Sequence, residues 1–361
     1  MEIYKACYVD NRSSEAHKYI NRLNAVGDLE VSYLAPPPDL SLSQIRAGTQ
    51  MFLVDWELSA RQESGVRVPY NGGTFAQRLR EEFEHTPIVL TSKNGKSTRS
   101  RRLNPYLFDA EIRVDEMEQE PACVVKKCVS LISGFDKLAQ ADKTWQGFMK
   151  VLGVTREDEE EQIGEAAPPL LKADGHTTWL VPEIAKWTQD VLLGYPGILY
   201  DPLHAATYLG IDVEEFLKPD VQEFVKDARY TGVLAPAEGR WWKGRLLSLA
   251  IALIIDAGIT RASLYDHFAL AFAQLHGREL QLAECIYSKE KPASRVCYIL
   301  KKPVRIEHSL TYLPDNRPLV MDEARVSFTA IQTSDEVFDE YFDAASRHLL
   351  DDIRSGDEDE P

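Results

Sequence analysis

The sequence reads Val9-Asp10-Asn11 near its start and Phe52-Leu53-Val54-Asp55 further on, and both times a short apolar run ends in a carboxylate. Parallel strands of an α/β sheet bring their carboxyl ends to one edge, and ligands bind at that edge. If both runs are strands of one sheet, Asp10 and Asp55 meet there. The two stretches therefore predict a phosphoacceptor or ion site, or the remnant of one.

Strand-like and helix-like segments alternate from residue 3 to about residue 135, as parallel βα units do. The expected strands are residues 3–9, 29–34, 50–54, 87–90 and 111–114. The expected helices are one from Ser13 or Ser14 to Leu23, a short one from Ser41 or Ser43, one over 74–83 and a closing one over 122–135. This order predicts an α/β, flavodoxin-like domain with a five-stranded parallel sheet over residues 1–135.

Asp10 follows the first expected strand, Asp55 the third and Thr91 the fourth. This order resembles the receiver domain of bacterial two-component response regulators, over about a third of the chain. The resemblance implies that Asp55 is the phosphoacceptor and Thr91 the switch hydroxyl. It also implies a weak Mg²⁺ site at Asp10 and Asp55.

The chain departs from the receiver pattern at three places. Asn11 stands where the family has a second acid, which removes a charge from a site for a hard cation. The Lys-Pro after strand five is absent, and Arg113 followed by acids stands there; the loop over residues 56–72 is longer than in the family. These changes weaken phosphoryl transfer and predict a degenerate receiver, or pseudo-receiver. The alternative is an unrelated flavodoxin-like sheet in which Asp10 and Asp55 cap helices or turns.

The loop over residues 93–102 follows the fourth strand and gathers cations among hydroxyls and a glycine. The cations are Lys93, Lys96, Arg99, Arg101 and Arg102. Such a loop is suited to phosphate, a nucleotide or an acidic partner. The alternative is a basic loop that only contacts solvent.

Beyond residue 135 we expect a helical connector and acidic linker over 136–175, which includes the run Glu157–Glu161. A mainly helical α+β output or adaptor domain is expected over 176–350, and an acidic disordered tail over 351–361. Within the output domain, strands over 296–300 and 325–329 are expected to form a hairpin, and residues 335–350 a helix.

Two segments of the output domain are candidate binding elements. The stretch around His204-Ala205-Ala206 and Gly210 is typical of the first half of a helix-turn-helix, over residues 203–217, and the alternative is a purely structural turn. Arg240, Trp241 and Trp242 form a candidate interface, since neighbouring tryptophans do not both face one core. The alternatives are that both wedge between domains or that one stacks on a nucleotide.

Composition narrows the class of protein. The net charge of −16 disfavours non-specific binding to nucleic acid. The five cysteines include no CxxC pair and are expected to be reduced and mostly buried. No run approaches the roughly 20 apolar residues of a membrane span, and no signal peptide is recognised, so we expect a cytoplasmic protein without membrane association.

These observations predict a bacterial signal-transduction protein whose degenerate receiver is coupled to a domain that binds a protein partner. The expected partner is a histidine-kinase-like sensor or another pathway component, in a stress or defence system. The first alternative is a DNA-binding transcriptional regulator using residues 203–217. A further alternative is an effector enzyme with a nucleotide at the basic loop, although no catalytic residues are recognised.

Overall fold

The computed structural model describes residues 3–60, 65–93, 107–168, 180–236, 238–260, 264–315, 318 and 321–355. The chain divides into two compact units, each made of several chain segments. The first unit is Met1–Val154, Pro168–Gln189 and Gly232–Ala237, and the second is Thr155–Ala167, Asp190–Thr231 and Glu238–Pro361. Among the described residues, no helix is long and apolar enough to cross a membrane.

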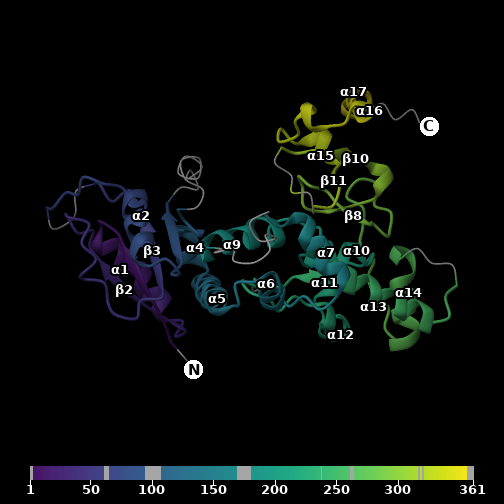
Figure 1. The fold of residues 1–361 in the computed structure, drawn as a ribbon. Helices are drawn as coiled ribbons and strands as arrows, with labels where there is room; N and C mark the ends of the chain where they lie inside the picture. Colours follow the sequence, from purple (N-terminus) through teal and green to yellow (C-terminus); the bar gives the residue numbers. More distant parts are fainter. Residues whose placement is uncertain are drawn as a thin grey trace. The chain divides into compact units, whose positions relative to one another are not determined.

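The first unit is built on a parallel sheet, drawn in purple and blue in Figure 1. Its strands are β1 (Tyr4–Val9), β2 (Leu29–Leu34), β3 (Met51–Asp55), β4 (Ile88–Ser92) and β5 (Ala110–Arg113). All neighbouring pairs are parallel, and the spatial order is β2-β1-β3-β4-β5. This is the doubly wound order of flavodoxin-like folds, so the predicted fold class is confirmed.

Helices pack on both faces of this sheet. Cys7 and Val9 of β1 belong to the cluster that contains Phe75 and Leu79 of α2 (Gly72–Glu82). Tyr8 points to the opposite face, as alternation along a strand requires, and its ring lies 6.4 Å from that of Tyr19 in α1 (Ser13–Asn24). The unit's other helices are α4 (Val114–Gln119), α5 (Pro121–Gln140), α6 (Trp145–Leu152) and α9 (Val181–Trp187).

One element expected in this unit is absent. Residues 41–50 contain turns and no helix, so the helix expected from Ser41 or Ser43 is wrong. The Ser41 and Ser43 hydroxyls lie 2.9 Å apart in a hydrogen bond, and the Ser43 N–H donates to Ser41 Oγ. These local side-chain bonds satisfy the backbone in a turn rather than capping a helix.

The second unit is mainly helical and carries only short strands. Its helices are α7 (Glu157–Ala166), α10 (Pro202–Tyr208), α11 (Val213–Phe216), α12 (Pro219–Phe224), α13 (Lys243–Asp256), α14 (Leu264–His276), α15 (Phe328–Thr333), α16 (Ala344–Arg347) and α17 (Leu350–Ser355). The shorter helical turns are η2 (Lys226–Ala228), η3 (Ile306–His308) and η4 (Asp339–Tyr341), and η1 (Thr188–Leu193) spans the boundary of the two units. Three antiparallel pairs join β6 (Leu199–Tyr200) to β7 (Trp241–Trp242), β8 (Arg295–Val296) to β9 (Pro303–Val304), and β10 (Ser309–Tyr312) to β11 (Ala324–Ser327).

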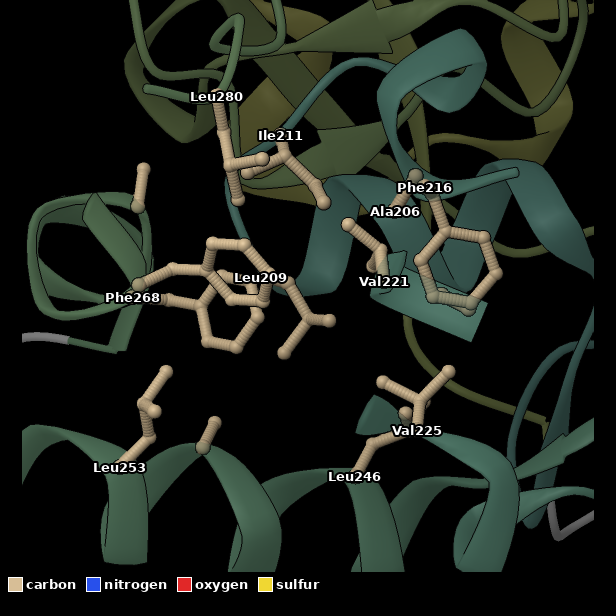
Figure 2. Packing of buried hydrophobic residues seen from close by; sticks show 14 of the residues in the cluster. Ala206, Leu209, Ile211, Phe216, Val221, Val225, Leu246, Leu253, Phe268 and Leu280 are labelled. Atoms are coloured by element: carbon tan, nitrogen blue, oxygen red, sulfur yellow. The ribbon is translucent and has the colours of Figure 1, made fainter. Parts of the chain in front are cut away.

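The larger core of this unit lies between α10, α13 and α14. Figure 2 shows Leu246 and Leu253 of α13 pointing into the same interior as Phe268 of α14 and Leu209. All four side chains are buried. A second cluster, centred on Cys285, Cys297 and Tyr312, occupies the region of the short hairpins.

The acid-rich run predicted to be a linker forms helix α7 instead. Four acids in its first turn favour the helix, because negative charge stabilises a helix N-terminus. Glu159 is 3% exposed and accepts two hydrogen bonds from Arg245, at 2.6 and 2.7 Å. A tertiary ion pair therefore fixes a segment whose composition alone indicates a solvated linker.

Two expectations for the C-terminal region are also wrong. The partner of β11 is β10, so the hairpin does not use residues 296–300. Residues 335–350 do not form one helix, because the Asp343 side chain accepts the Ser346 N–H and starts α16. The buried Phe342 lies in extended backbone before it.

Candidate functional site

The candidate site lies where β1 and β3 end. Val9 pairs with Val54, so Asp10 and Asp55 leave neighbouring strands side by side, and Asp55 pairs with Thr91 on β4. In a sheet with this strand order, the crevice between β1 and β3 is the ligand-binding switch point. The structure thus brings together the three residues that the sequence singled out.

The two carboxyl groups are buried beside each other, with Asp10 2% and Asp55 6% exposed. Burial and then the charge of Asp10 raise the pKa of Asp55 to about 7. Burial also raises the pKa of Asp10, although the Arg12 N–H donates to its Oδ1 at 2.8 Å. An acid pair in this state favours any cation that enters, because a cation offsets both charges.

Two polar side chains next to the acid pair have no partner. Asn11 is 2% exposed, and neither its amide oxygen nor its amide nitrogen makes a hydrogen bond. The hydroxyl of Thr91, fully buried, makes none within hydrogen-bond geometry, and it lies next to the Tyr8 hydroxyl. Buried polar groups are normally paired, so Asn11 and Thr91 hold hydrogen-bonding capacity that the described residues do not use.

Two cations border the site and share one acid. Arg12 lies 3.8 Å from Asp10 through Nε and 3.1 Å from Glu15 through Nη1. Lys93 Nζ lies 2.5 Å from the same Glu15 oxygen. Both cations are partly exposed, so Glu15 holds them at the rim.

The long loop after β3 returns to Asp55, at the end of that strand. The Gly72 N–H donates to Trp56 O at 2.9 Å, and a side chain at Gly72 would place its Cβ 2.1 Å from Asp55 O. Asn71 then caps α2 by accepting the Thr74 N–H. Glycine is required at this point, and it lets the N-terminus of α2 lie against Asp55.

The family's lysine after strand five has no substitute at that position. Arg113 is half-exposed and pairs with Asp115, its Nε donating to Asp115 Oδ1 at 2.9 Å. The cations near the acid pair come instead from the ends of β1 and β4. Sequence reasoning missed Arg12 and Glu15, although their positions one and four residues after Asn11 were a usable signal for residues at the edge of the site.

Comparison with known proteins gives similarity in structure only. No protein-family model matches the chain. No curated protein matches it. Solved structures of receiver domains do. The strand order of the first unit is that of flavodoxin-like folds, the class to which receiver domains belong.

Three of those structures are similar to the chain at low identity. A receiver domain protein from Methanospirillum hungatei is 14% identical, with 38% of this chain and 98% of that chain covered and a TM-score of 0.30. The chemotaxis protein CheY4 of Vibrio cholerae is 15% identical, covering 36% and 99%, with a TM-score of 0.29. The BeF3-activated receiver domain of Klebsiella pneumoniae RstA is 18% identical, covering 36% and 97%, with a TM-score of 0.28.

Most of the predicted basic loop lies outside the described residues. Lys96, Arg99, Arg101 and Arg102 fall there, and Lys93 is the loop cation that the structure describes. Because Lys93 reaches Glu15, the start of this loop lies at the rim of the acid site.

The prediction that a tryptophan is exposed at an interface is wrong. Trp241 and Trp242 are each 1% exposed, and they point to opposite sides of β7. Trp241 packs edge-on to Phe216, and Trp242 packs edge-on to Tyr230. The Arg240 side chain is mostly buried too and donates to the Leu193 carbonyl.

The helix-turn-helix-like segment is part of the second unit's core. Ala205 and Ala206 are fully buried, and Gly210 takes the left-handed conformation that ends the turn. Helix α11 has only four residues, and Phe216 in it is buried. Such a helix is too short to read a DNA groove, so the structural interpretation of this segment holds.

Proposed function

We propose that this chain is a bacterial signal-transduction protein in which the receiver-like unit accepts a phosphoryl group at Asp55. The observation that carries the proposal is the pair of unpartnered polar side chains, Asn11 and Thr91, beside two buried carboxyl groups. A Mg²⁺ ion and a phosphoryl group would satisfy all four.

The residues present fit Mg²⁺, with one ligand weaker than in the family. Asp10, Asp55 and the free amide oxygen of Asn11 are oxygen ligands, which Mg²⁺ requires. Bound there, the ion would offset the negative charge of a transferred phosphoryl group. Arg12 is a competing cation, since its Nε lies 3.8 Å from Asp10. We therefore propose a weak site.

The chemistry asked of Asp55 is a single displacement. A carboxylate oxygen of Asp55 attacks the phosphorus of a phosphodonor, the donor's bond to phosphorus breaks, and the donor leaves with that electron pair. Asp55 must be ionised to attack, and with a pKa of about 7 it is mostly ionised only above neutral pH. Lys93 and Arg12 would then move from Glu15 to the new phosphoryl oxygens.

The signal is proposed to leave the unit through Thr91. Its hydroxyl has no partner, so it is available to bind a phosphoryl oxygen. Such a rearrangement would bias binding of a protein partner, either a histidine-kinase-like sensor or another component of the same pathway. The second unit is proposed to serve as the output or adaptor part.

Beryllofluoride with Mg²⁺ tests the site without a kinase, because it mimics an acyl phosphate. Trp56 follows Asp55 directly and packs on Gly73, so its fluorescence should report binding. We expect a saturable change in the full chain that disappears in Asp55→Asn. Trp56→Phe removes the reporter and is the matched control. No change in the wild type, or the same change in Asp55→Asn, refutes the site.

Partner binding is tested separately, by affinity capture of the full chain with and without beryllofluoride. A protein retained in stoichiometric amount in only one of the two conditions supports signalling through Asp55. A partner retained equally in both, and by Asp55→Asn, would leave a scaffold and refute phosphorylation control.

A further inference from the structure

Four pairs of residues in the second unit share one spacing, three positions from the first member to the second. They are Cys285 with Ser288, Cys297 with Leu300, Arg305 with His308, and Ser327 with Ala330. Cys285, Cys297, Leu300 and Ala330 belong to one hydrophobic cluster, which also takes in Val304 of β9 and Val326 of β11. Cys-x-x-Cys pairs with this spacing are the ligand pairs of structural zinc sites.

The first two pairs form the same backbone turn. The Cys285 N–H donates to Glu290 O and the Lys289 N–H donates to Cys285 O, both at 3.0 Å. In the second turn the Cys297 N–H donates to Lys302 O at 2.8 Å, and the Lys301 N–H to Cys297 O at 2.9 Å.

Each turn ends at a lysine in the left-handed conformation, and each directs backbone N–H groups at the sulfur of its cysteine. Lys289 and Lys301 have φ of 65° and 50°, the left-handed region that side chains rarely adopt. The Leu300 N–H donates to Cys297 Sγ at 3.5 Å, and the N–H groups of Tyr287 and Ser288 face Cys285 Sγ. Two unrelated turns with these shared features point to one common design.

The first pair contacts the third, and the second pair contacts the fourth. The third pair joins the first, since the Arg305 N–H donates to Cys285 Sγ at 3.4 Å and His308 Nδ1 lies 3.9 Å from that sulfur. This separation is close to the roughly 3.5 Å between two ligands of a tetrahedral zinc ion. The fourth pair joins the second, since both the N–H and the hydroxyl of Ser327 donate to Cys297 Sγ, at 3.4 and 3.3 Å.

The residues at these positions do not fit zinc. Zinc takes thiolate, imidazole and carboxylate ligands. The first set keeps Cys285 and His308 but has Ser288 and Arg305, and an arginine is always a cation. The second set keeps only Cys297, with Leu300, Ser327 and Ala330 in the other places.

In both sets, residues at or next to the ligand positions already contact other protein groups. At the first set, Arg305 Nη1 lies 2.9 Å from Glu290, and Arg305 Nε also pairs with Glu307. These two acids and His308 have ligand atoms within 4.8 Å of one another, so they resemble a metal cluster, but the Arg305 guanidinium already pairs with both acids. At the second set, the Ser327 hydroxyl bonds the sulfur and also caps α15.

We infer that residues 283–315 and 321–333 retain the chain path of a two-ion zinc module and fold without metal, with the Cys285–Arg305 and Cys297–Ser327 contacts in place of the two ions. Restoring the missing ligands of one set should therefore create a zinc site in the existing backbone. The stability of the second unit should not depend on zinc supply or on chelators. This inference is independent of the signalling site in the first unit.

The native protein gives the first test. The full chain, produced with zinc in the medium and purified without chelator, should contain far less than one zinc per chain by elemental mass spectrometry. Its melting temperature should not change with a strong chelator. Stoichiometric zinc, or a melting temperature lowered by the chelator, would overturn the inference.

Ligand restoration gives the second test. Ser288→Cys with Arg305→Cys completes a Cys₃His set with Cys285 and His308. This variant should bind about one Co²⁺ per chain, with the absorption of a tetrahedral thiolate site that Zn²⁺ displaces. The matched control carries the same two changes on a Cys285→Ser, His308→Asn background and should lose that absorption. A folded variant that takes no cobalt, or a control that binds equally well, refutes the inference.

The second set decides the matter if the first variant does not fold. Leu300→Cys, Ser327→Cys and Ala330→Cys complete a Cys₄ set with Cys297, and the same cobalt spectrum is expected. If this variant is folded and does not bind cobalt, the inference fails.

Discussion

At the scale of single residues, Asp55 dominates the receiver-like unit because its charge is both buried and repelled by Asp10. An ionised carboxyl group in this position destabilises the folded state unless a ligand binds it. Binding of a cation or a phosphoryl group at the site should therefore increase the stability of the folded state. This view leads to two predictions about individual side chains.

The first prediction concerns pH. The pKa of Asp55 rises from 3.8 to about 7 on folding, so between these values the folded state binds more protons than the unfolded state. The free energy of unfolding must then fall as pH rises through this window, by an amount on the order of 4 kcal/mol at most. Asp55→Asn lacks this loss and should be more stable than the wild type at pH 8, with little difference at pH 4. Urea titrations at both pH values check this, and an equal difference at the two would contradict it.

The second prediction concerns Asn11. Asn11→Asp supplies the second acid of the receiver pattern and should tighten Mg²⁺ binding by roughly tenfold, because affinity rises with the charge of the ligands. Without Mg²⁺ the same variant should be less stable than the wild type, since a third buried charge joins the pair. Thermal melts with and without Mg²⁺ measure both effects. Asn21→Asp, at an exposed position of α1, is the control for an added charge, and an Asn11→Asp variant whose melting is insensitive to Mg²⁺ contradicts the assignment.

At the scale of elements, backbone contacts position the site. Gly72 starts α2 against the Asp55 carbonyl, with no room for a Cβ. We expect Gly72→Ala to cost about 1–3 kcal/mol of stability through overpacking and to displace Asp55. Gly244→Ala in α13 is the control, since its Cβ would meet only an Asp158 oxygen at 3.3 Å. If denaturant unfolding shows equal stability for both variants, the close approach at Gly72 is not real.

Helix α7 depends on one ion pair in the second unit. Glu159→Gln leaves Arg245 without its buried partner and should cost about 3–5 kcal/mol. Glu157→Gln, on the exposed side of the same helix, should change little. Denaturant unfolding of both variants distinguishes the two acids. A small loss for Glu159→Gln would show that α7 does not need this contact.

The elements that sequence predicted well are those whose own residues decide them. Residues 6–9 of β1 and 51–54 of β3 are apolar and buried because both faces of the sheet are covered, and the ends of these runs locate Asp10 and Asp55. Where a distant residue decides, the prediction failed. Arg245 fixes α7 from far along the chain, and no local pattern reveals it.

The prediction that a tryptophan is exposed was also wrong because of contacts with residues distant in the sequence. Alternation along β7 does separate Trp241 from Trp242, as expected, but both sides of the strand are covered, one by Phe216 and the other by Tyr230. At the site itself, the acids and Thr91 were found from sequence alone. The role of Glu15, which pairs with both Arg12 and Lys93, was not found, because Lys93 lies far along the chain, just after β4.

At the scale of the whole molecule, neither unit is one continuous stretch of chain. The first includes Gly232–Ala237, and the second includes Thr155–Ala167. A fragment that ends at residue 135 would therefore lack parts of the first unit, and each experiment above uses the full chain. The two proposals concern separate units. In the first unit we propose that the buried Asp10–Asp55 pair binds a cation, and in the second we infer that the turns at Cys285 and Cys297 fold without metal.

Phosphorylation of Asp55 is tested most directly by intact-mass analysis of the full chain after incubation with acetyl phosphate, with and without Mg²⁺. We expect a single phosphoryl adduct at pH 8 that needs Mg²⁺ and is absent from Asp55→Asn, while Asp28→Asn, at a half-buried position just before β2, keeps it. If the wild type shows no adduct at any Mg²⁺ concentration, or if Asp55→Asn is modified equally, Asp55 is not a phosphoacceptor.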